Sequence, residues 1–200
     1  MPVPPTRDER RNLREARRGK DSLELLFVGV DWARKGGAIA VETARLLNLA
    51  GIRTTLRVAG ARPEGDYPEF VEFLGFINKN TSDGLRKLDE LFRRADFFIL
   101  PTLAEAAGIV FAEASSFGLP ILTYATGGAT DCVRNGVAGF CLPPGAPPSE
   151  FARTIARIHA DPAEYLNLSF GASLEYEILL NWDISVKKLI AAFSQAIQYN

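Results

Sequence analysis

Short apolar runs alternate with helical segments along most of this 200-residue chain. The β-prone runs occur at residues 23–30, 53–58, 70–74, 97–100, 121–124 and 139–142. Helix-like segments lie between or after them, at residues 37–49, 85–92, 108–117 and 147–158, and the chain looks helical from residue 162 onward. This alternation is typical of βαβ units, in which helices cover both faces of a parallel sheet. We therefore predict an α/β fold built on a parallel sheet.

Polar or glycine-containing segments directly follow four of the predicted strands, at residues 29–37, 75–79, 101–108 and 125–128. In such sheets ligands bind beyond the carboxyl ends of the strands. We therefore expect these segments to form the functional site. The backbone of residues 75–79 could frame a nucleobase. Residues 125–128 either contact a ligand or form only a tight turn between strand and helix.

Two glutamates, Glu105 and Glu113, stand on either side of a predicted helix start at Gly108. At a helical rise of ~1.5 Å per residue they lie at most about 12 Å apart, roughly the reach of a sugar–diphosphate–ribose. Their carboxylates could bind hydroxyls at both ends of such a molecule, while the helix N-terminus binds its phosphates. The alternative for Glu105 is an exposed residue that favours the helix dipole. Glu113 has apolar neighbours and needs a partner if buried, so we favour a ligand contact there.

The loop after the first predicted strand carries two adjacent cations, Arg34 and Lys35, between Gly29 and a pair of glycines. Backbone amides and the dipole of the next helix favour an anion there. Arg34 offers a planar fork for phosphate oxygens and Lys35 a point charge; the alternative is a solvated pair on a tight turn. The sequence contains neither G-x-G-x-x-G after this strand nor G-x-x-x-x-G-K-[ST], which weakens a nicotinamide oxidoreductase and a P-loop ATPase.

Composition and charge exclude further classes. The net charge of −1 provides no global basic field for nucleic acid, and no stretch approaches the ~20 apolar residues of a membrane span. Cys132 and Cys141 give neither a disulfide framework nor metal-ligand spacing, so a cytoplasmic location is expected. The single histidine, His159, ends a predicted helix, where it favours the dipole, so we do not expect a histidine base.

The N-terminal segment is basic, with seven Arg and Lys side chains against three acidic ones in residues 1–20. The simplest interpretation is a solvated helix or linker. A membrane-surface or phosphate contact is the alternative, although the segment lacks the apolar stripe of an interfacial helix.

Several motifs together resemble those of one enzyme family. They are Phe-Val-Gly-x5-Lys-Gly at residues 27–36, Phe-Leu-Gly-Phe at residues 73–76, and a longer run in residues 101–128 that contains Glu105-x2-Gly108-x4-Glu113-Ala114, Gly118-x-Pro120 and Gly127-Gly128. The pattern is similar to that of the group 1 glycosyltransferases of GT-B fold, which are retaining, nucleotide-sugar-dependent enzymes. The resemblance covers most of residues 23–160. It implies a Rossmann-like parallel sheet with helices on both faces, one half of a GT-B fold.

The resemblance implies a role for each matching residue. Glu105 and Lys35 would be catalytic: Glu105 would contact the donor sugar and stabilise positive charge at the anomeric carbon, and Lys35 would neutralise the leaving diphosphate. The donor-binding residues would be Glu113 on the ribose hydroxyls, the amides of Gly108, Ile109 and Val110 on the diphosphate and sugar, and Gly29 and Arg34 in the first loop. No metal is expected if Lys35 and the amides balance the phosphate charge. No cofactor is expected, because the nucleotide-diphosphate sugar is a substrate.

Two positions depart from the family pattern. Val30 stands where an arginine usually follows the glycine of the first loop, so Arg34 is the candidate for the second cation. Ala106 and Ala107 replace the usual Gly-Phe pair, which affects the fit around the donor sugar.

The resemblance extends to only one of the two Rossmann-like domains of a GT-B enzyme. Residues 1–22 would be a linker and residues 23–200 the donor-binding domain, whose C-terminal helices would pack back across the cleft. The expected partners are a nucleotide-sugar donor, the missing N-terminal acceptor domain and, for the full-length enzyme, a peripheral membrane contact. The chain alone would bind donor weakly and turn over little.

The alternative is a non-catalytic Rossmann-like nucleotide-binding or interaction module in which the glutamates are structural. This alternative predicts that Glu105 pairs with an arginine, that Glu113 is held by backbone amides, and that no open cleft lies between them.

Overall fold

A parallel sheet of six strands forms the centre of the molecule, in the order β3-β2-β1-β4-β5-β6. The computed structural model describes residues 2–198, without the side chains of residues 192 and 195–198. The strands are β1 (Ser22–Gly29), β2 (Arg53–Gly60), β3 (Val71–Gly75), β4 (Phe97–Leu100), β5 (Ile121–Tyr124) and β6 (Gly139–Leu142). Every neighbouring pair of strands is parallel. The predicted α/β fold class is therefore confirmed.

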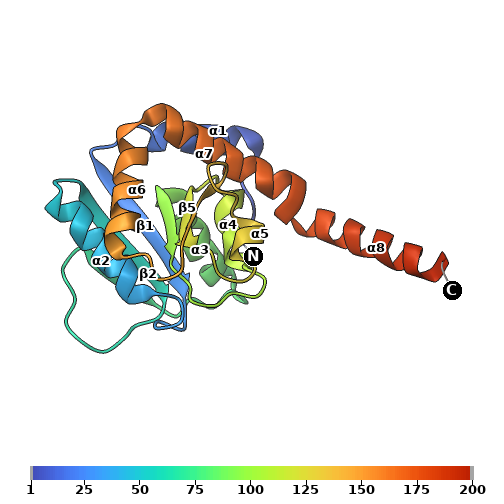
Figure 1. Ribbon diagram of the computed structural model, residues 1–200, viewed down its shortest axis with the longest axis horizontal. Coiled ribbons are helices and arrows are strands. Elements are labelled where there is room, and N and C mark those ends of the chain that lie inside the picture. The colour runs from blue at the N-terminus through green and yellow to red at the C-terminus, as the bar shows by residue number, and fades with distance from the viewer. Residues whose placement is uncertain (1, 199–200) are drawn as a thin grey trace.

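Helices cover both faces of this sheet (Figure 1). They are α2 (Gly37–Leu49), α3 (Ser82–Arg94), α4 (Ile109–Ser116), α5 (Ala129–Cys132), α6 (Pro148–Ala160) and α7 (Pro162–Glu175). Helices α2 and α6 pack against each other. On the other face, the ring of Phe92 in α3 stacks on that of Phe117 at the end of α4. Strands β2 and β3 lie on one side of β1, and strands β4 to β6 lie on the other. The strand order therefore reverses between β1 and β4, and open α/β sheets bind ligands at such a switch point.

The strands next to the switch point are buried on both faces. All four residues of β4 and all four of β5 are buried. This burial explains why neither strand shows an alternating pattern in the sequence: β4 is wholly apolar, and β5 contains one buried polar side chain, Thr123, whose hydroxyl donates to the Leu100 carbonyl. Phe151, Ile155 and Ile158 of α6 are buried as their helical spacing predicts.

The basic N-terminal segment contains a helix, α1 (Arg7–Arg17), that packs against α7. Thr6 and Glu9 form a reciprocal capping box at its start, a signal that the sequence carries. Arg10 and Arg17 are buried, so the interpretation of the whole segment as solvated is wrong for these two side chains. Arg17 donates hydrogen bonds to the carbonyl oxygens of Phe92 and Phe117, at 2.9 and 2.8 Å. The role of residues 1–22 as a linker stays a prediction.

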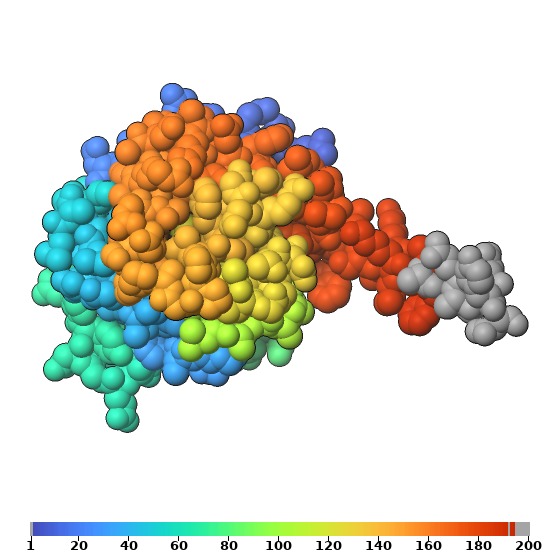
Figure 2. Space-filling view, viewed as in Figure 1, coloured from blue at the N-terminus to red at the C-terminus, as the bar shows by residue number. Residues whose placement is uncertain are grey.

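Beyond α7 the chain passes through a π-helical turn, η1 (Tyr176–Leu180), into α8 (Trp182–Gln198). Helix α8 extends away from the sheet domain, as Figures 1 and 2 show. Apolar residues along it are exposed, among them Val186, Leu189, Ile190 and Phe193. Ile197, which the helical spacing places in the same series, lies outside the described side chains. None of the helices in residues 2–198 is both long and apolar enough to cross a bilayer.

Candidate functional site

The loops that follow β1, β3, β4 and β5 meet at the carboxyl edge of the sheet. The amide of Leu103 donates to the carbonyl of Arg34 at 2.8 Å, which joins the loops after β4 and β1. Lys79, after β3, reaches Glu113 in α4. The four segments that the sequence singled out are therefore neighbours in space, because parallel strands bring their carboxyl ends to one edge.

The first loop lies against the loop after β4. Gly36 begins α2 with a positive φ of 74°, and a Cβ there would lie 2.1 Å from the carbonyl oxygen of Pro101. Arg34 uses its guanidinium within the protein, donating to Asp31 at 2.9 Å and to the carbonyl of Ala104 at 2.9 Å. Hydrogen bonds from the Arg34 amide and then its side chain lower the pKa of Asp31. Arg34 thus holds the two loops together, and its predicted contact with phosphate stays a prediction.

The two residues predicted to be catalytic contact each other. Lys35 Nζ donates to Glu105 Oε2 in an ion pair. Only 13% of the Lys35 side chain and 12% of the Glu105 side chain are exposed. The exposed-loop alternative for Glu105 therefore does not describe its position. A fixed cation and a fixed carboxylate lie side by side at the carboxyl edge, on the loops after β1 and β4.

Glu113 is buried, with 1% of its side chain exposed. Its required partner is Lys79, whose Nζ donates to both carboxylate oxygens at 2.7 Å. The sequence analysis missed Lys79 as an individual site residue. The signal that could have found it was its place in residues 75–79, directly after a strand.

Helix α4 begins at this edge with Gly108 in the left-handed region, at a φ of 58°. A Cβ on Gly108 would lie 2.7 Å from the Phe111 ring, so the position is shaped for glycine both by conformation and by space. The next residue, Ile109, is 49% exposed, and Val110 is partly buried. The first amides of a helix have no acceptor within it and carry a partial positive charge, so this end of α4 can receive an anion.

The loop that carries Glu105 is held mainly through its backbone. Thr126 Oγ1 donates to the carbonyl of Thr102 at 2.7 Å, and the Gly128 amide donates to the carbonyl of Glu105 at 2.9 Å. A Cβ on Gly128 would lie 2.1 Å from the carbonyl oxygen of Ala106. Residues 125–128 therefore do more than connect β5 to α5: they support the Glu105 loop.

A cavity of about 260 Å³ opens at the ends of β1 and β2. Gly29 and Val30 line it on one side, and residues 76–80, Lys79 among them, line it on the other. Gly60 at the end of β2 has a φ of 109°, and a Cβ there would lie 2.6 Å from the Gly29 carbonyl oxygen. The cavity therefore adjoins both the first loop and the lysine that contacts Glu113.

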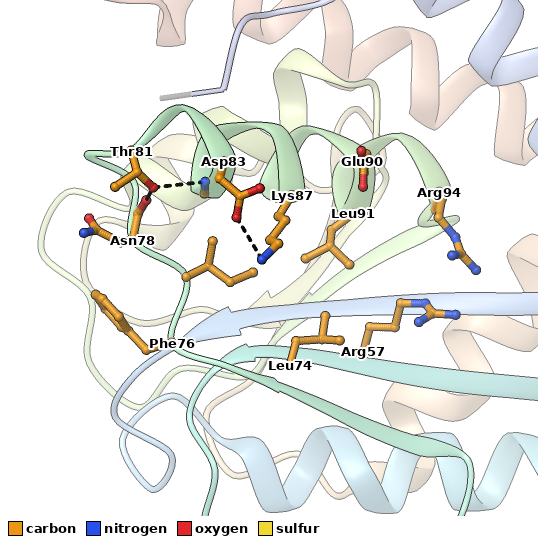
Figure 3. Close-up of a pocket in the computed structure, with 12 residues that line it drawn as sticks. Arg57, Leu74, Phe76, Asn78, Thr81, Asp83, Lys87, Glu90, Leu91 and Arg94 are labelled. Atoms are coloured by element: carbon orange, nitrogen blue, oxygen red, sulfur yellow. Dashed lines mark hydrogen bonds and ion pairs between the residues drawn. The ribbon is translucent and has the colours of Figure 1, made fainter.

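A larger cavity, of about 600 Å³, lies between α3 and the strands β2 and β3 (Figure 3). It shares residues 76–78 with the smaller one but is lined by none of the residues predicted individually as catalytic or donor-binding. Its cations already have carboxylate partners: Lys87 pairs with Asp83, and Arg57 and Arg94 both pair with Glu24. We place the site at the smaller cavity because Gly29 and Lys79, the partner of Glu113, line that cavity and do not line the larger one.

The glutamates do not show the pattern expected for a purely structural role. Glu105 pairs with a lysine rather than an arginine, and Glu113 is held by a lysine rather than by backbone amides. Among the residues that the structure describes, no group of three or more His, Cys, Asp or Glu side chains is arranged to hold a metal ion. Burial raises the pKa of the Cys132 thiol, which keeps it protonated at neutral pH.

The sheet order is that of a Rossmann-like domain, and known structures show where such a domain occurs as one half of a GT-B fold. The structure superimposes on sucrose-phosphate synthase from Thermosynechococcus elongatus with a TM-score of 0.70 and 24% identity, covering 98% of this chain and 50% of that one. It also superimposes on Anabaena Alr3699/HepE, solved in complex with UDP and glucose, with a TM-score of 0.71 and 21% identity, covering 96% of this chain and 53% of that one. These likenesses confirm the Rossmann-like fold.

Residues 22–161 match the family described as glycosyl transferases group 1, and the chain belongs to that family. D-inositol 3-phosphate glycosyltransferase 1 of Catenulispora acidiphila is 30% identical over 191 residues, a region that covers 89% of this chain and 45% of that protein. The chain thus spans about half the length of the relatives it matches. The family resemblance seen in the motifs is confirmed.

Proposed function

We propose that this chain is the donor-binding domain of a retaining, hexosyltransferase-like enzyme, which transfers a sugar from a nucleotide-diphosphate sugar to an acceptor hydroxyl. The observation that carries this proposal is the pair of glutamates around the start of α4, each with a lysine at its carboxylate. Alr3699/HepE, a structural neighbour, has been solved with UDP-glucose bound, which favours a ligand of this class for the same fold.

Each of these site residues contacts a different part of the nucleotide sugar. Glu113 takes the ribose hydroxyls, the amides at the start of α4 take the diphosphate, and Glu105 lies beside the sugar. Lys35 neutralises the charge that develops on the leaving diphosphate, and Glu105 stabilises the positive charge at the anomeric carbon. Fixed charges of this kind lower the barrier because they need no reorganisation during the reaction. The ion pair between Lys35 and Glu105 keeps both side chains in place for these roles.

The acceptor would be bound mainly by a second domain, which accounts for the other half of the length of the relatives. We assign the exposed apolar residues of α8 to contact with that domain. Because this domain would also contribute catalytic groups, we expect the chain alone to bind donor weakly and to transfer little sugar.

A donor panel tests the proposed function. Isothermal calorimetry of the chain with UDP, GDP, ADP, UDP-glucose and GDP-mannose should detect binding of at least one of these compounds. Hydrolysis or transfer by the chain alone should remain near the uncatalysed rate. The proposal fails if none of these nucleotides or nucleotide sugars binds.

Replacing Gly128 by alanine should weaken binding at the sugar end of the site. The new methyl group meets the carbonyl of Ala106 and displaces the loop that carries Glu105, whereas a φ of −70° at Gly128 suits alanine equally well. We expect the affinity for UDP-glucose to fall roughly tenfold, the effect of one lost hydrogen bond to a charged group, with less change for UDP. Gly51→Ala is the control: it lies before β2, at the opposite edge of the sheet, where a Cβ meets nothing within 4 Å, so it shows the effect of strain at a positive φ (82°) away from the site. Equal affinities of both variants for UDP-glucose would contradict this role.

A further inference from the structure

The carboxylate assigned to ribose already has a strong partner. Lys79 Nζ lies 2.7 Å from both oxygens of Glu113, whose side chain is 1% exposed. A carboxylate that is buried to this degree needs a cation or several donors. A ribose hydroxyl that bonds to Glu113 must therefore displace the ammonium group or share the carboxylate with it.

The two partners differ in their freedom to move. The side chain of Lys79 is 40% exposed, so its ammonium group can leave Glu113 without being stranded away from water. The residue stands on the loop after β3, outside any helix or strand, at the end of a flexible four-carbon stem. Glu113 lies within α4 and is buried, so it cannot follow. When the ion pair between Lys79 and Glu113 separates, it is therefore the lysine side chain that moves.

The cavity that Lys79 lines also reaches the end of β1, next to the first loop. Lys79 and Gly29 both line the 260 Å³ cavity, and Gly29 ends β1 just before the loop where phosphate is expected. The other two cations of the site are less free: Lys35 is 13% exposed in its pair with Glu105, and Arg34 is bonded to Asp31 and Ala104. Lys79 is thus the cation best placed to change partners within the cavity.

From these contacts we infer that Lys79 is a specificity-determining residue that selects phosphorylated nucleotides over nucleosides. When a nucleoside diphosphate binds, its ribose takes Glu113 and the released ammonium group of Lys79 pairs with a phosphate oxygen. One ion pair is exchanged for another, so little electrostatic free energy is lost. A nucleoside also has to break the ion pair between Lys79 and Glu113, but it has no phosphate with which Lys79 could pair afterwards. This cost weakens the binding of nucleosides relative to nucleotides, and selective sites commonly use such a penalty.

This inference rests on the proposed function, because it requires a nucleotide at Glu113. Its test compares the dissociation constants of UDP and uridine, and of GDP and guanosine, for the wild-type chain and two variants. Lys79→Met removes the charge but keeps the length of the side chain. Lys79→Gln retains an N–H donor for Glu113, so it covers the case in which the methionine variant folds poorly. Lys87→Met is the matched control, because Lys87 is an exposed lysine that pairs with Asp83 on α3.

We expect the ratio of nucleoside to nucleotide dissociation constants to fall at least about tenfold in the folded Lys79 variants, the effect of one lost charge-assisted hydrogen bond. UDP or GDP should bind more weakly, the nucleoside equally well or more tightly, and Lys87→Met should keep the wild-type ratio. A role limited to stability would change the melting temperature without changing this ratio. An unchanged ratio in a chain that binds UDP or GDP would overturn the inference and leave the proposed function intact. ADP and adenosine replace these pairs if the panel shows that the chain binds only ADP, and if the wild type binds no compound of the panel, both fail together.

Discussion

Replacing Glu113 by alanine should reduce the affinity of the chain for its nucleotide by about tenfold or more. Two ribose hydroxyls that donate to one carboxylate form charge-assisted hydrogen bonds, and each contributes about 1.5–3 kcal/mol. Part of this gain is offset in the wild type, because the nucleotide has to displace Lys79 from Glu113, a step that the variant does not require. A net loss of ~1.4 kcal/mol or more corresponds to a factor of ten. The measurement is calorimetric titration with the nucleoside diphosphate that the wild-type chain binds best.

Folding should survive this substitution, because the partner that loses its carboxylate, Lys79, is 40% exposed and can be solvated. Circular dichroism of the variant should retain the wild-type spectrum. Glu150→Ala is the control, because Glu150 is a glutamate of α6 whose visible partner is Arg153 on the same helix. If Glu113→Ala binds nucleotide as tightly as Glu150→Ala does, the ribose role is wrong.

Replacing Arg17 by methionine should lower the free energy of unfolding by about 3 kcal/mol. The guanidinium donates to the carbonyls of Phe92 and Phe117, at the C-terminal ends of α3 and α4, and also to those of Arg93 and Gly118. Methionine can occupy much of the same space but donates nothing, so these carbonyls lose their partner in a buried position. Urea denaturation measures the change.

Arg18→Met gives the matched control for this second prediction. Arg18 is 52% exposed and pairs with Glu15 on the surface of α1, an interaction that typically contributes less than about 1 kcal/mol. The midpoint of denaturation should therefore be much lower for Arg17→Met than for Arg18→Met. Similar midpoints would show that Arg17 does not hold α1 to the ends of α3 and α4.

The sheet could be predicted from the sequence because its central strands are buried on both faces. In β4 every side chain is apolar, and in β5 the buried polar side chain of Thr123 donates to the Leu100 carbonyl, so both strands appear in the sequence as largely apolar runs. The site edge could be predicted for a related reason. Once the strands are known to be parallel, the loops after them must meet, so the neighbourhood of Glu105, Lys35 and Glu113 follows from topology.

The side-chain partners within that edge could not be predicted in the same way. Lys79 and Glu113 are 34 residues apart, and their contact depends on the path of the loop after β3 across the start of α4. The structural role of Arg17 could not be predicted for a different reason. Arginine is usually exposed, so nothing in its type indicates that it caps two helix ends inside the protein. In both cases the local sequence shows which residue is present, but it does not show which distant group its side chain contacts in the fold.

The support of the Glu105 loop has a consequence for how such a domain can diversify. Apart from the ion pair of Lys35 with the Glu105 carboxylate, the main contacts to residues 102–105 from neighbouring loops end on main-chain atoms: Arg34, Thr126 and Gly128 bond to the carbonyls of Ala104, Thr102 and Glu105. Ala106 and Ala107 are exposed. Their side chains can therefore be exchanged for larger or more polar ones while the carbonyl scaffold beneath them persists. In the proposed donor site, substitutions at Ala106 and Ala107 would therefore change the preference for one sugar over another without altering the residues assigned to the phosphates.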